Sequence, residues 1–228
     1  MLDKFRCEYI IHFYGACFIP NKLCLVTEYA PHGSLQDLIH REDSVKPRLI
    51  IRLKFMLDAA KGIQYLHNNG ILHRDIKPDN FLVISMEENV PVNCKLTDFG
   101  SSRNINLLMT NMTFTKGVGT PIYMAPEILM KDKYSKPADV YSFSITMLET
   151  MIWRDPYPDT EFKFPWDVAN FFIKEKRLPQ PDDLDAGLYK VICECWHQKP
   201  KDRLKIEDAI SMLETVFMER FGGIVNPE

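Results

Sequence analysis

Several features that would place this chain in a broad functional class are missing from its sequence. No apolar run approaches the length of a membrane span, and residues 1–6 are charged rather than forming an apolar signal core. The formal net charge is -3, so no basic excess is available to neutralise nucleic-acid phosphates. We therefore expect a cytoplasmic protein with no membrane segment and no nucleic-acid partner.

Cysteine pairs of the kind that bind zinc are also missing. The six cysteines are scattered, and none forms a Cys-x-x-Cys pair. Cys193 and Cys195 lie in an expected helix, where residues two apart point in different directions. We interpret the cysteines as free buried thiols in a reducing compartment.

What is present suffices for a substantial core. The chain has 228 residues, of which 46% are hydrophobic and 26% charged, as in a folded domain rather than a disordered one. Alternating or β-branched runs predict short strands, and apolar residues at helical spacing predict helices. The expected strands cover residues 9–14, 23–29, 81–84 and 94–97, and the expected helices begin after Ser34 and cover 48–68, 135–151, 168–176, 188–197 and about 206–220.

The sequence His-Arg-Asp-Ile-Lys-Pro-Asp-Asn, residues 73–80, concentrates polar chemistry in one stretch. Asp75 can accept a hydroxyl proton, Lys77 supplies a cation, and Asn80 with the later Asp98 supplies oxygen ligands for Mg²⁺. These are the parts that phosphoryl transfer needs. A polar turn is the better explanation for His-Arg-Asp alone, but chance poorly explains the whole octet followed by Asp-Phe-Gly.

A second unusual residue is Asp139, which stands at the start of a helix that is apolar on nearly every side. An ionised acid in such a place must be paired or must accept hydrogen bonds.

Taken together and in order, these motifs resemble those of a eukaryotic protein kinase. The octet resembles its catalytic loop, Asp98-Phe99-Gly100 its metal loop, and Ala125-Pro126-Glu127 the end of its activation segment. Further similarity lies in Leu25–Ala30 (hinge strand), Asp139–Phe143 (central helix), Trp196 and Arg203 (closing helical region). Phe13–Ala16, Gly33–Leu35 and 139–143 are similar to the tyrosine-kinase-like group.

The resemblance implies an α+β fold, with a mainly helical large lobe and a remnant of a small β lobe. Residues 1–220 would be the kinase domain, in which 1–30 form the small-lobe remnant and hinge and 31–220 the large lobe. Residues 221–228 would be a short tail.

The resemblance also implies residue roles, with ATP and Mg²⁺ as cofactors and proteins carrying Ser or Thr as substrates. Asp75 would be the catalytic base, Lys77 would neutralise the γ-phosphoryl group, and Asn80 and Asp98 would hold Mg²⁺. The adenine pocket would be formed by Thr27 (gatekeeper), Glu28 and Ala30 (backbone) and Leu82 (floor).

Other residues would support this site. Glu127 and Arg203 would form a buried ion pair, and Asp139 would accept backbone N–H groups of the catalytic loop. Arg74 could pair with a phosphate added to the hydroxyls of 101–115, although solvated hydroxyls are the better account of most of them. The supporting set is His73, Arg74, Phe99, Gly100, Thr120, Glu127, Asp139 and Arg203.

The lysine two positions after Asp75, together with Thr120, resembles the Ser/Thr-specific pattern, with dual specificity possible. We therefore expect a signalling kinase that phosphorylates serine and threonine.

The sequence departs from the family before the hinge. No Gly-x-Gly-x-x-Gly occurs in the 228 residues, and the Val-Ala-Ile-Lys strand is also absent. The expectation is a chain that starts inside the small lobe, binds ATP poorly and turns over little or nothing. Two alternatives stay open: a non-catalytic binding module with a kinase shape, and a small-molecule kinase of the aminoglycoside type. The substrate-docking shape of 101–127 favours a protein substrate over the second.

Overall fold

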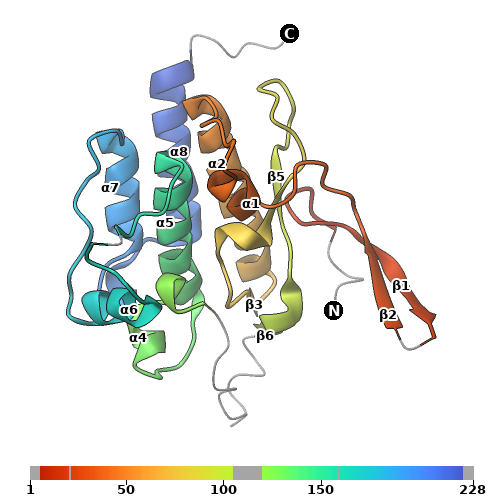
Figure 1. Cartoon of the computed structure of the whole chain (residues 1–228), viewed down its shortest axis with the longest axis horizontal. Coiled ribbons are helices and arrows are strands. Elements are labelled where there is room, and N and C mark those ends of the chain that lie inside the picture. Colours follow the sequence, from red (N-terminus) through yellow and green to blue (C-terminus); the bar gives the residue numbers. More distant parts are fainter. Residues whose placement is uncertain (1–5, 21, 105–119, 159, 223–228) are drawn as a thin grey trace.

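The computed structural model describes residues 6–20, 22–104, 120–158 and 160–222. Figure 1 shows a helical body from which one β-hairpin extends to the side. The helices are α1 (Leu35–His40), α2 (Leu49–Asn68), α4 (Pro126–Leu129), α5 (Lys136–Ile152), α6 (Pro165–Ile173), α7 (Ala186–Cys195) and α8 (Ile206–Phe221). Within the described ranges, no helix is both long and apolar enough to cross a membrane.

Helix α5 lies at the centre of the body, between α2 on one side and α7 on the other (Figure 1). Every residue of α5 from Ala138 to Ile152 is buried, which confirms the helix that is apolar all round. Pro137 is accommodated in its first turn, where the missing N–H costs nothing. Helix α2 packs against α5 and α8, so these helices bury one continuous core.

In the part of the chain that the structure describes, three pairs of short antiparallel strands complete the fold. They are β1 (Phe13–Ile19) with β2 (Lys22–Thr27), β3 (Ile71–Leu72) with β6 (Arg103–Asn104), and β4 (Phe81–Val83) with β5 (Cys94–Leu96). The β4–β5 ribbon confirms the two strands expected at 81–84 and 94–97. It places Asn80 directly before β4 and Asp98 two residues after the end of β5.

The strand expected at residues 9–14 is wrong at its start. Strand β1 begins only at Phe13, while Ile10 and Ile11 lie buried against the body. Ile11 donates its N–H to the carbonyl of Leu96, and Leu96 donates to the carbonyl of Tyr9. This segment therefore pairs with β5, and only the residues after it turn outwards into the hairpin.

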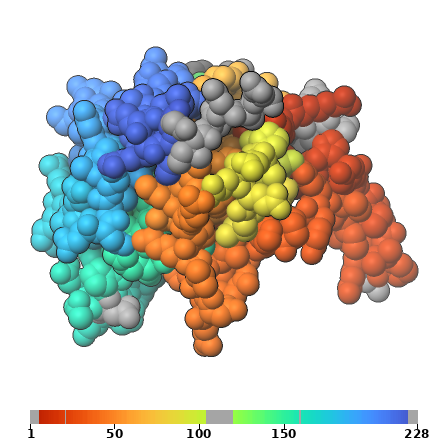
Figure 2. Space-filling view, turned by 90° about the horizontal axis from the view of Figure 1, so that it is seen from above, coloured from red at the N-terminus to blue at the C-terminus, as the bar shows by residue number. Residues whose placement is uncertain are grey.

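The β1–β2 hairpin stands away from the body, as the red atoms in Figure 2 show. Its large apolar side chains are solvent-exposed, with Phe18 84% and Leu23 60% exposed. A register irregularity between Phe13 and Gly15 marks the base of the hairpin, where the chain leaves the body.

Local capping signals explain most helix ends. Ser34 and Asp37 form the expected capping box at the start of α1, and Gly70 adopts a left-handed φ of 68° just beyond α2. Helix α7 begins two residues earlier than expected because Asp185 accepts hydrogen bonds from Gly187 N and Leu188 N.

The prediction of a helix at 168–176 is wrong by three residues at each end, because α6 covers Pro165–Ile173. It begins at Pro165, whose fixed φ suits a first turn, with Asp167 accepting the N–H groups of Lys163 and Phe164. It ends before Glu175, which has a left-handed φ of 61°. The 168–176 prediction followed the apolar residues and overlooked these two backbone features.

Candidate active site

The octet 73–80 lies between β3 and β4, where it forms an irregular loop that ends in a short 3₁₀ turn, η2 (Pro78–Asn80). Pro78 takes the first position of this turn. At a first position the fixed φ and missing N–H of a proline are tolerated.

The Lys77 side chain contacts Asp75 and also Thr120, which lies 43 positions later in the chain. Lys77 Nζ lies 3.2 Å from Asp75 Oδ2 and donates to Thr120 Oγ1 at 3.1 Å. Thr120 is the first described residue after position 104, and it leads into the 3₁₀ turn η4 (Pro121–Tyr123). The lysine thus joins the octet to the segment before Glu127.

Asn80 is oriented by the same carboxylate. Its side-chain nitrogen donates to the backbone carbonyl of Asp75 at 2.7 Å and to Asp75 Oδ2 at 3.3 Å. Its own backbone carbonyl accepts the N–H of Thr97 at 2.9 Å, which holds the residue before Asp98 beside it. Asp75, Asn80 and Asp98 are therefore brought together through β4 and β5, although 23 positions separate the first from the last.

Asp98 occupies a left-handed conformation with φ 57° and accepts the N–H of Gly100 through Oδ1 at 3.1 Å. Left-handed backbone is uncommon for a residue other than glycine and commonly marks a functional site. Since the amide nitrogen of Asn80 faces Asp75, its carbonyl oxygen is the atom left for a cation. That oxygen and the Asp98 carboxylate are the hard donors that Mg²⁺ prefers, so the residues fit this ion.

The proposed Mg²⁺ site has two protein ligands, Asn80 and Asp98, and not a complete coordination shell of protein atoms. Among the residues described, no group of three or more His, Cys, Asp or Glu side chains could hold a metal ion. Mg²⁺ usually keeps several waters and takes one or two protein oxygens with substrate phosphates. The pair is therefore enough for a metal that arrives with a nucleotide.

His73 is fully buried and makes two contacts that define its tautomer. Nε2 lies 2.9 Å from the carbonyl of Thr97, and Nδ1 accepts the N–H of Asp75 at 3.3 Å. One neutral form, with the proton on Nε2, satisfies both contacts. Burial lowers the pKa of His73 below its ordinary value, against the opposing effect of nearby acids, and so favours that neutral form. Phe99 packs edge-on against the ring at 5.6 Å.

Asp139 holds the start of the 73–80 loop through hydrogen bonds to its backbone. It is 0% exposed and accepts the N–H of His73 at 3.0 Å and the N–H of Arg74 at 2.9 Å. His67 Nε2 and the Tyr134 hydroxyl also donate to it, each at 2.9 Å. Burial alone would raise the pKa of Asp139, but His67 and the backbone N–H groups outweigh it and hold the pKa below its ordinary value.

These bonds hold Arg74 in an unusual backbone conformation, with a φ of 74°. Its guanidinium lies over the Tyr134 ring at 5.6 Å, and its buried Nε has no hydrogen-bond partner among the residues that the structure describes. Burial lowers the pKa of Arg74, and neighbouring Arg103 adds to this effect. Of the expected phosphate acceptors, Ser102 is buried with its hydroxyl toward the His73 carbonyl, while 110, 113 and 115 lie outside the described residues.

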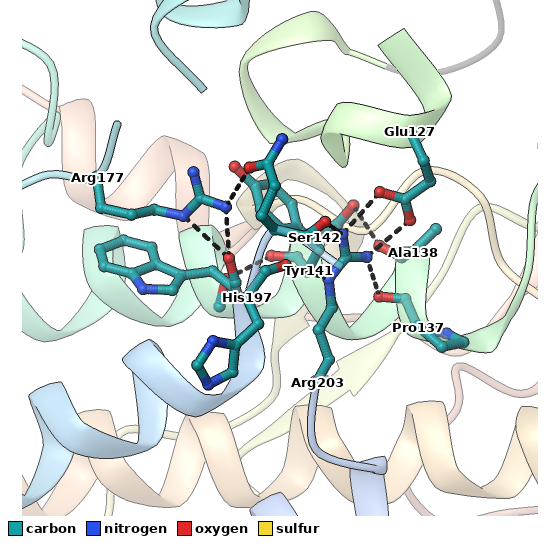
Figure 3. A network of polar contacts seen from close by, with 11 residues as sticks. Glu127, Pro137, Ala138, Tyr141, Ser142, Arg177, His197 and Arg203 are labelled. Atoms are coloured by element: carbon teal, nitrogen blue, oxygen red, sulfur yellow. Dashed lines mark hydrogen bonds and ion pairs between the residues drawn. The ribbon is translucent and has the colours of Figure 1, made fainter. Parts of the chain in front are cut away.

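The Glu127–Arg203 pair braces the segment that carries Thr120 (Figure 3). Arg203 donates from both terminal nitrogens to the Glu127 carboxylate at 2.7 Å, in the bidentate geometry of the strongest pairs. Its remaining donors reach the carbonyls of Pro137, His197 and Gln198. All five guanidinium donors are thus used, and this offsets the cost of burying the charge.

The sequence was compared with families of known proteins. Residues 1–213 match the family described as Protein kinase domain. The chain belongs to the protein kinase family.

Its curated relatives include serine/threonine-protein kinases from the amoeba Dictyostelium discoideum. The chain is 35% identical over 224 residues to "Probable serine/threonine-protein kinase gdt9", covering 86% of this chain and 14% of that protein. It is 34% identical over 225 residues to "Dual specificity protein kinase shkC", covering 96% of this chain and 42% of that protein. The chain therefore spans less than half the length of these relatives.

In this chain, the residues expected around adenine lie just after the end of β2. Glu28 donates its backbone N–H to the carbonyl of His12, and its carboxylate pairs with Lys95 Nζ at 2.5 Å. The described residues give the Glu28 carbonyl and the Ala30 N–H no backbone partner, so both are available to a ligand. Leu82 is half-buried on β4, whereas Thr27, expected to limit pocket depth, is exposed.

Sequence reasoning missed several residues of the candidate site. Tyr134 and His67 complete the ring of donors around Asp139, and Lys95 orients Glu28. A buried acid at a helix start predicts that donors exist but not where they lie in the chain. Lys95 is the exception, because a lysine on a strand entering the metal loop could have been flagged from its position.

Proposed function

We propose that this chain transfers the γ-phosphate of ATP to serine and threonine hydroxyls of protein substrates. The observation that carries the proposal is the contact of Lys77 with both Asp75 and Thr120, at 3.2 and 3.1 Å. It joins the proposed base to the segment that would dock the substrate. The names of the relatives support the Ser/Thr assignment.

In this proposal, Asp75 binds the substrate hydroxyl and orients it towards the γ-phosphorus. The hydroxyl oxygen forms the new P–O bond while the bond to the β,γ-bridging oxygen breaks, and ADP leaves. The hydroxyl proton passes to the Asp75 carboxylate. Because positioning and charge dominate this reaction, an ordinary carboxylate suffices as the base.

Lys77 would hold charge on the transferring group, and its contact with Thr120 keeps the ammonium between base and substrate segment. Asn80 and Asp98 would hold Mg²⁺, which supplies charge neutralisation for the phosphates when bound. The Glu28 carbonyl and the Ala30 N–H would pair with adenine, with Leu82 beneath the ring. Thr27 would border this pocket.

The proposal extends to specificity and context. We assign the chain to the tyrosine-kinase-like group with a Ser/Thr-type catalytic loop, and one relative is named as a dual-specificity kinase. We also infer a role in intracellular signalling, within the cytoplasm. The domain assignment of 1–30 and 31–220 belongs to the same proposal.

The test begins with nucleotide binding, measured on the 228-residue chain as a thermal shift with Mg-ATP at millimolar concentration. We expect a rise in Tm that is lost in Asp98→Asn. Asp79→Asn is the matched control, since Asp79 is exposed in the same loop and undergoes the same charge change. Its shift should equal that of the unchanged chain.

Transfer is then measured with a generic protein substrate. The rate should be low, because the 228 residues contain neither a glycine-rich loop nor an Ala-x-Lys strand. Asp75→Asn should reduce it by about 100-fold or more, whereas Asp79→Asn should leave it unchanged. Transfer that survives Asp75→Asn would overturn the role of Asp75.

One observation favours a second candidate, a non-catalytic binding module. The hairpin presents Tyr14, Phe18 and Leu25 to solvent at 67%, 84% and 58% exposure. Such apolar exposure is typical of a surface that another polypeptide covers. No Tm shift with Mg-ATP and no transfer would favour this candidate over the kinase.

A further inference from the structure

The β1–β2 hairpin (Figure 1) has two cysteines directly opposite each other in its register. The antiparallel register pairs Cys17 with Cys24, two pairs in from the tip pair Ile19 and Lys22. Residues directly opposed in an antiparallel ladder project their side chains on the same face. The two thiols are therefore neighbours across the hairpin.

This placement meets the geometric requirement for a disulfide. Opposed residues of an antiparallel pair have Cα atoms about 5.5 Å apart where they are hydrogen-bonded and about 4.5 Å apart where they are not. Disulfides join Cα atoms about 4.4 to 6.8 Å apart, so either type of pair lies within that range. Closing the bond needs side-chain rotation and no change of register.

Both thiols are also accessible. Cys17 is exposed and Cys24 is partly exposed, and their neighbours Phe18, Leu23 and Leu25 are exposed as well. A small thiol reagent can reach the pair from solvent without local unfolding.

The other four cysteines are poorly placed for the same chemistry. Cys94 and Cys195 are buried, and Cys7 and Cys193, which are partly exposed like Cys24, have no cysteine opposite them in a strand pair of the described residues. Burial raises the pKa of all four thiols and so reduces the thiolate fraction that attacks a disulfide. Cys193 and Cys195 are close in sequence, but on α7 they point in different directions.

We propose that Cys17 and Cys24 are a modification site that closes to an intrachain disulfide by exchange with a low-molecular-weight disulfide such as oxidised glutathione. One cysteine thiolate attacks a glutathione sulfur, and one reduced glutathione leaves as the mixed disulfide forms. The second cysteine attacks the protein sulfur of that mixed disulfide and releases the second glutathione. The two protein thiols lose two electrons and two protons, and both are gained by glutathione.

The bond would tie β1 to β2 just before residues 27–30, which leave the hairpin. It would fix the register of the two strands near the tip of the hairpin. The inference is independent of the proposed phosphoryl transfer, because it rests on the strand pairing alone.

Trypsin provides the test, because Lys22 lies between the two cysteines. The reduced 228-residue chain is incubated with oxidised glutathione, its remaining thiols are alkylated, and it is digested without reductant. Cleavage leaves residues 7–22 and 23–41 as separate peptides, which a Cys17–Cys24 bond holds together in the mass spectrum. We expect this link to exceed every other cysteine pair by about tenfold or more, since opposed thiols react intramolecularly.

Single variants identify the partners. Cys7 shares a tryptic peptide with Cys17, so Cys7→Ser should retain the link and Cys17→Ser and Cys24→Ser should lose it. Each of the last two should instead carry a glutathione adduct on its remaining hairpin cysteine. Cys193→Ser is the control and should leave the link unchanged.

Three results would overturn the proposal. They are glutathione adducts on both hairpin cysteines with no link, a link between two chains in place of one within a chain, and a link that Cys7→Ser removes. Because Cys17 is exposed on the hairpin, its replacement should leave the fold intact, and circular dichroism of each variant verifies this.

Discussion

The helical body and the β1–β2 hairpin use the same kinds of side chain in opposite ways. In the body, Phe143 and Tyr141 on α5 are 0% exposed, whereas Phe18 on the hairpin is 84% exposed. The body is stabilised by burial of apolar surface and by buried polar networks, and the hairpin by strand pairing. Substitutions in the body should therefore lower the free energy of unfolding strongly, and substitutions in the hairpin should lower it little.

The largest effect should follow Arg203→Ala. The change leaves the buried Glu127 carboxylate without its partner, which typically costs about 3–5 kcal/mol. Urea unfolding followed by circular dichroism measures the loss. Arg220→Ala is the matched control, because the Arg220–Asp185 pair lies at the surface and its loss should cost about 1 kcal/mol or less. Equal losses for the two variants would contradict the prediction.

Asp58 should give the body a distinctive pH dependence. Its buried carboxylate accepts the N–H groups of Asn93 and Cys94, yet burial prevails and raises its pKa to about 6. Since the unfolded pKa is about 3.9, this group's contribution to stability is complete below that pH and is lost as the pH rises through 6. The expected loss is roughly 3 kcal/mol, at about 1.36 kcal/mol per pKa unit.

The measurement for Asp58 is the difference in unfolding free energy between the unchanged chain and Asp58→Asn, from pH 4 to pH 7. This difference should shift in favour of Asp58→Asn as the pH rises. Asp182→Asn repeats the substitution at an exposed position and controls for the change of residue type. A flat difference across this range would show that Asp58 does not titrate there.

A smaller effect should follow Ser34→Ala at the junction of hairpin and body. The Ser34 hydroxyl accepts the N–H of Asp37 and donates to its carboxylate, which completes the capping box of α1. Loss of such a cap costs about 1 kcal/mol, whereas Ser34→Gly should cost only a few tenths. Chemical denaturation of both variants tests the order, and a greater loss for glycine would contradict it.

The smallest effect should come from the hairpin itself. Phe18→Ser should change the free energy of unfolding by about 0.5 kcal/mol or less, as exposed positions usually do. Phe143→Ala supplies the contrast, since emptying a fully buried phenylalanine site costs about 3–5 kcal/mol. Thermal unfolding of the two variants measures the loss of Tm in each. Equal losses would contradict the difference in stability that we expect between the hairpin and the body.

Much of the body could be predicted from local sequence. Helix α5 follows from its apolar composition and α2 from its periodic apolar residues, and Gly70 marks where α2 ends. The octet 73–80 could be found because its chemistry is contained in consecutive residues. These features depend on neighbours in sequence, so a single sequence contains the information.

What could not be predicted depends on partners distant in the chain. The residues before β1 look like the start of a strand, and nothing local shows that they pair with Leu96 and not with β2. The shift of α6 has a different cause, since its limits are set by Pro165 and by the left-handed Glu175 and not by its apolar residues. Likewise, an acid at residue 139 requires donors, but only the fold reveals that Tyr134 and His67 supply them.

The position of Asp139 has a consequence for the order in which the protein folds. Its four donors come from α2, from the loop at 73–74 and from Tyr134, two residues before α5. The left-handed backbone of Arg74 has no such support until those segments have met, so the loop cannot form ahead of them. Refolding protein should therefore regain its helices first and the loop at 73–80 among the last elements.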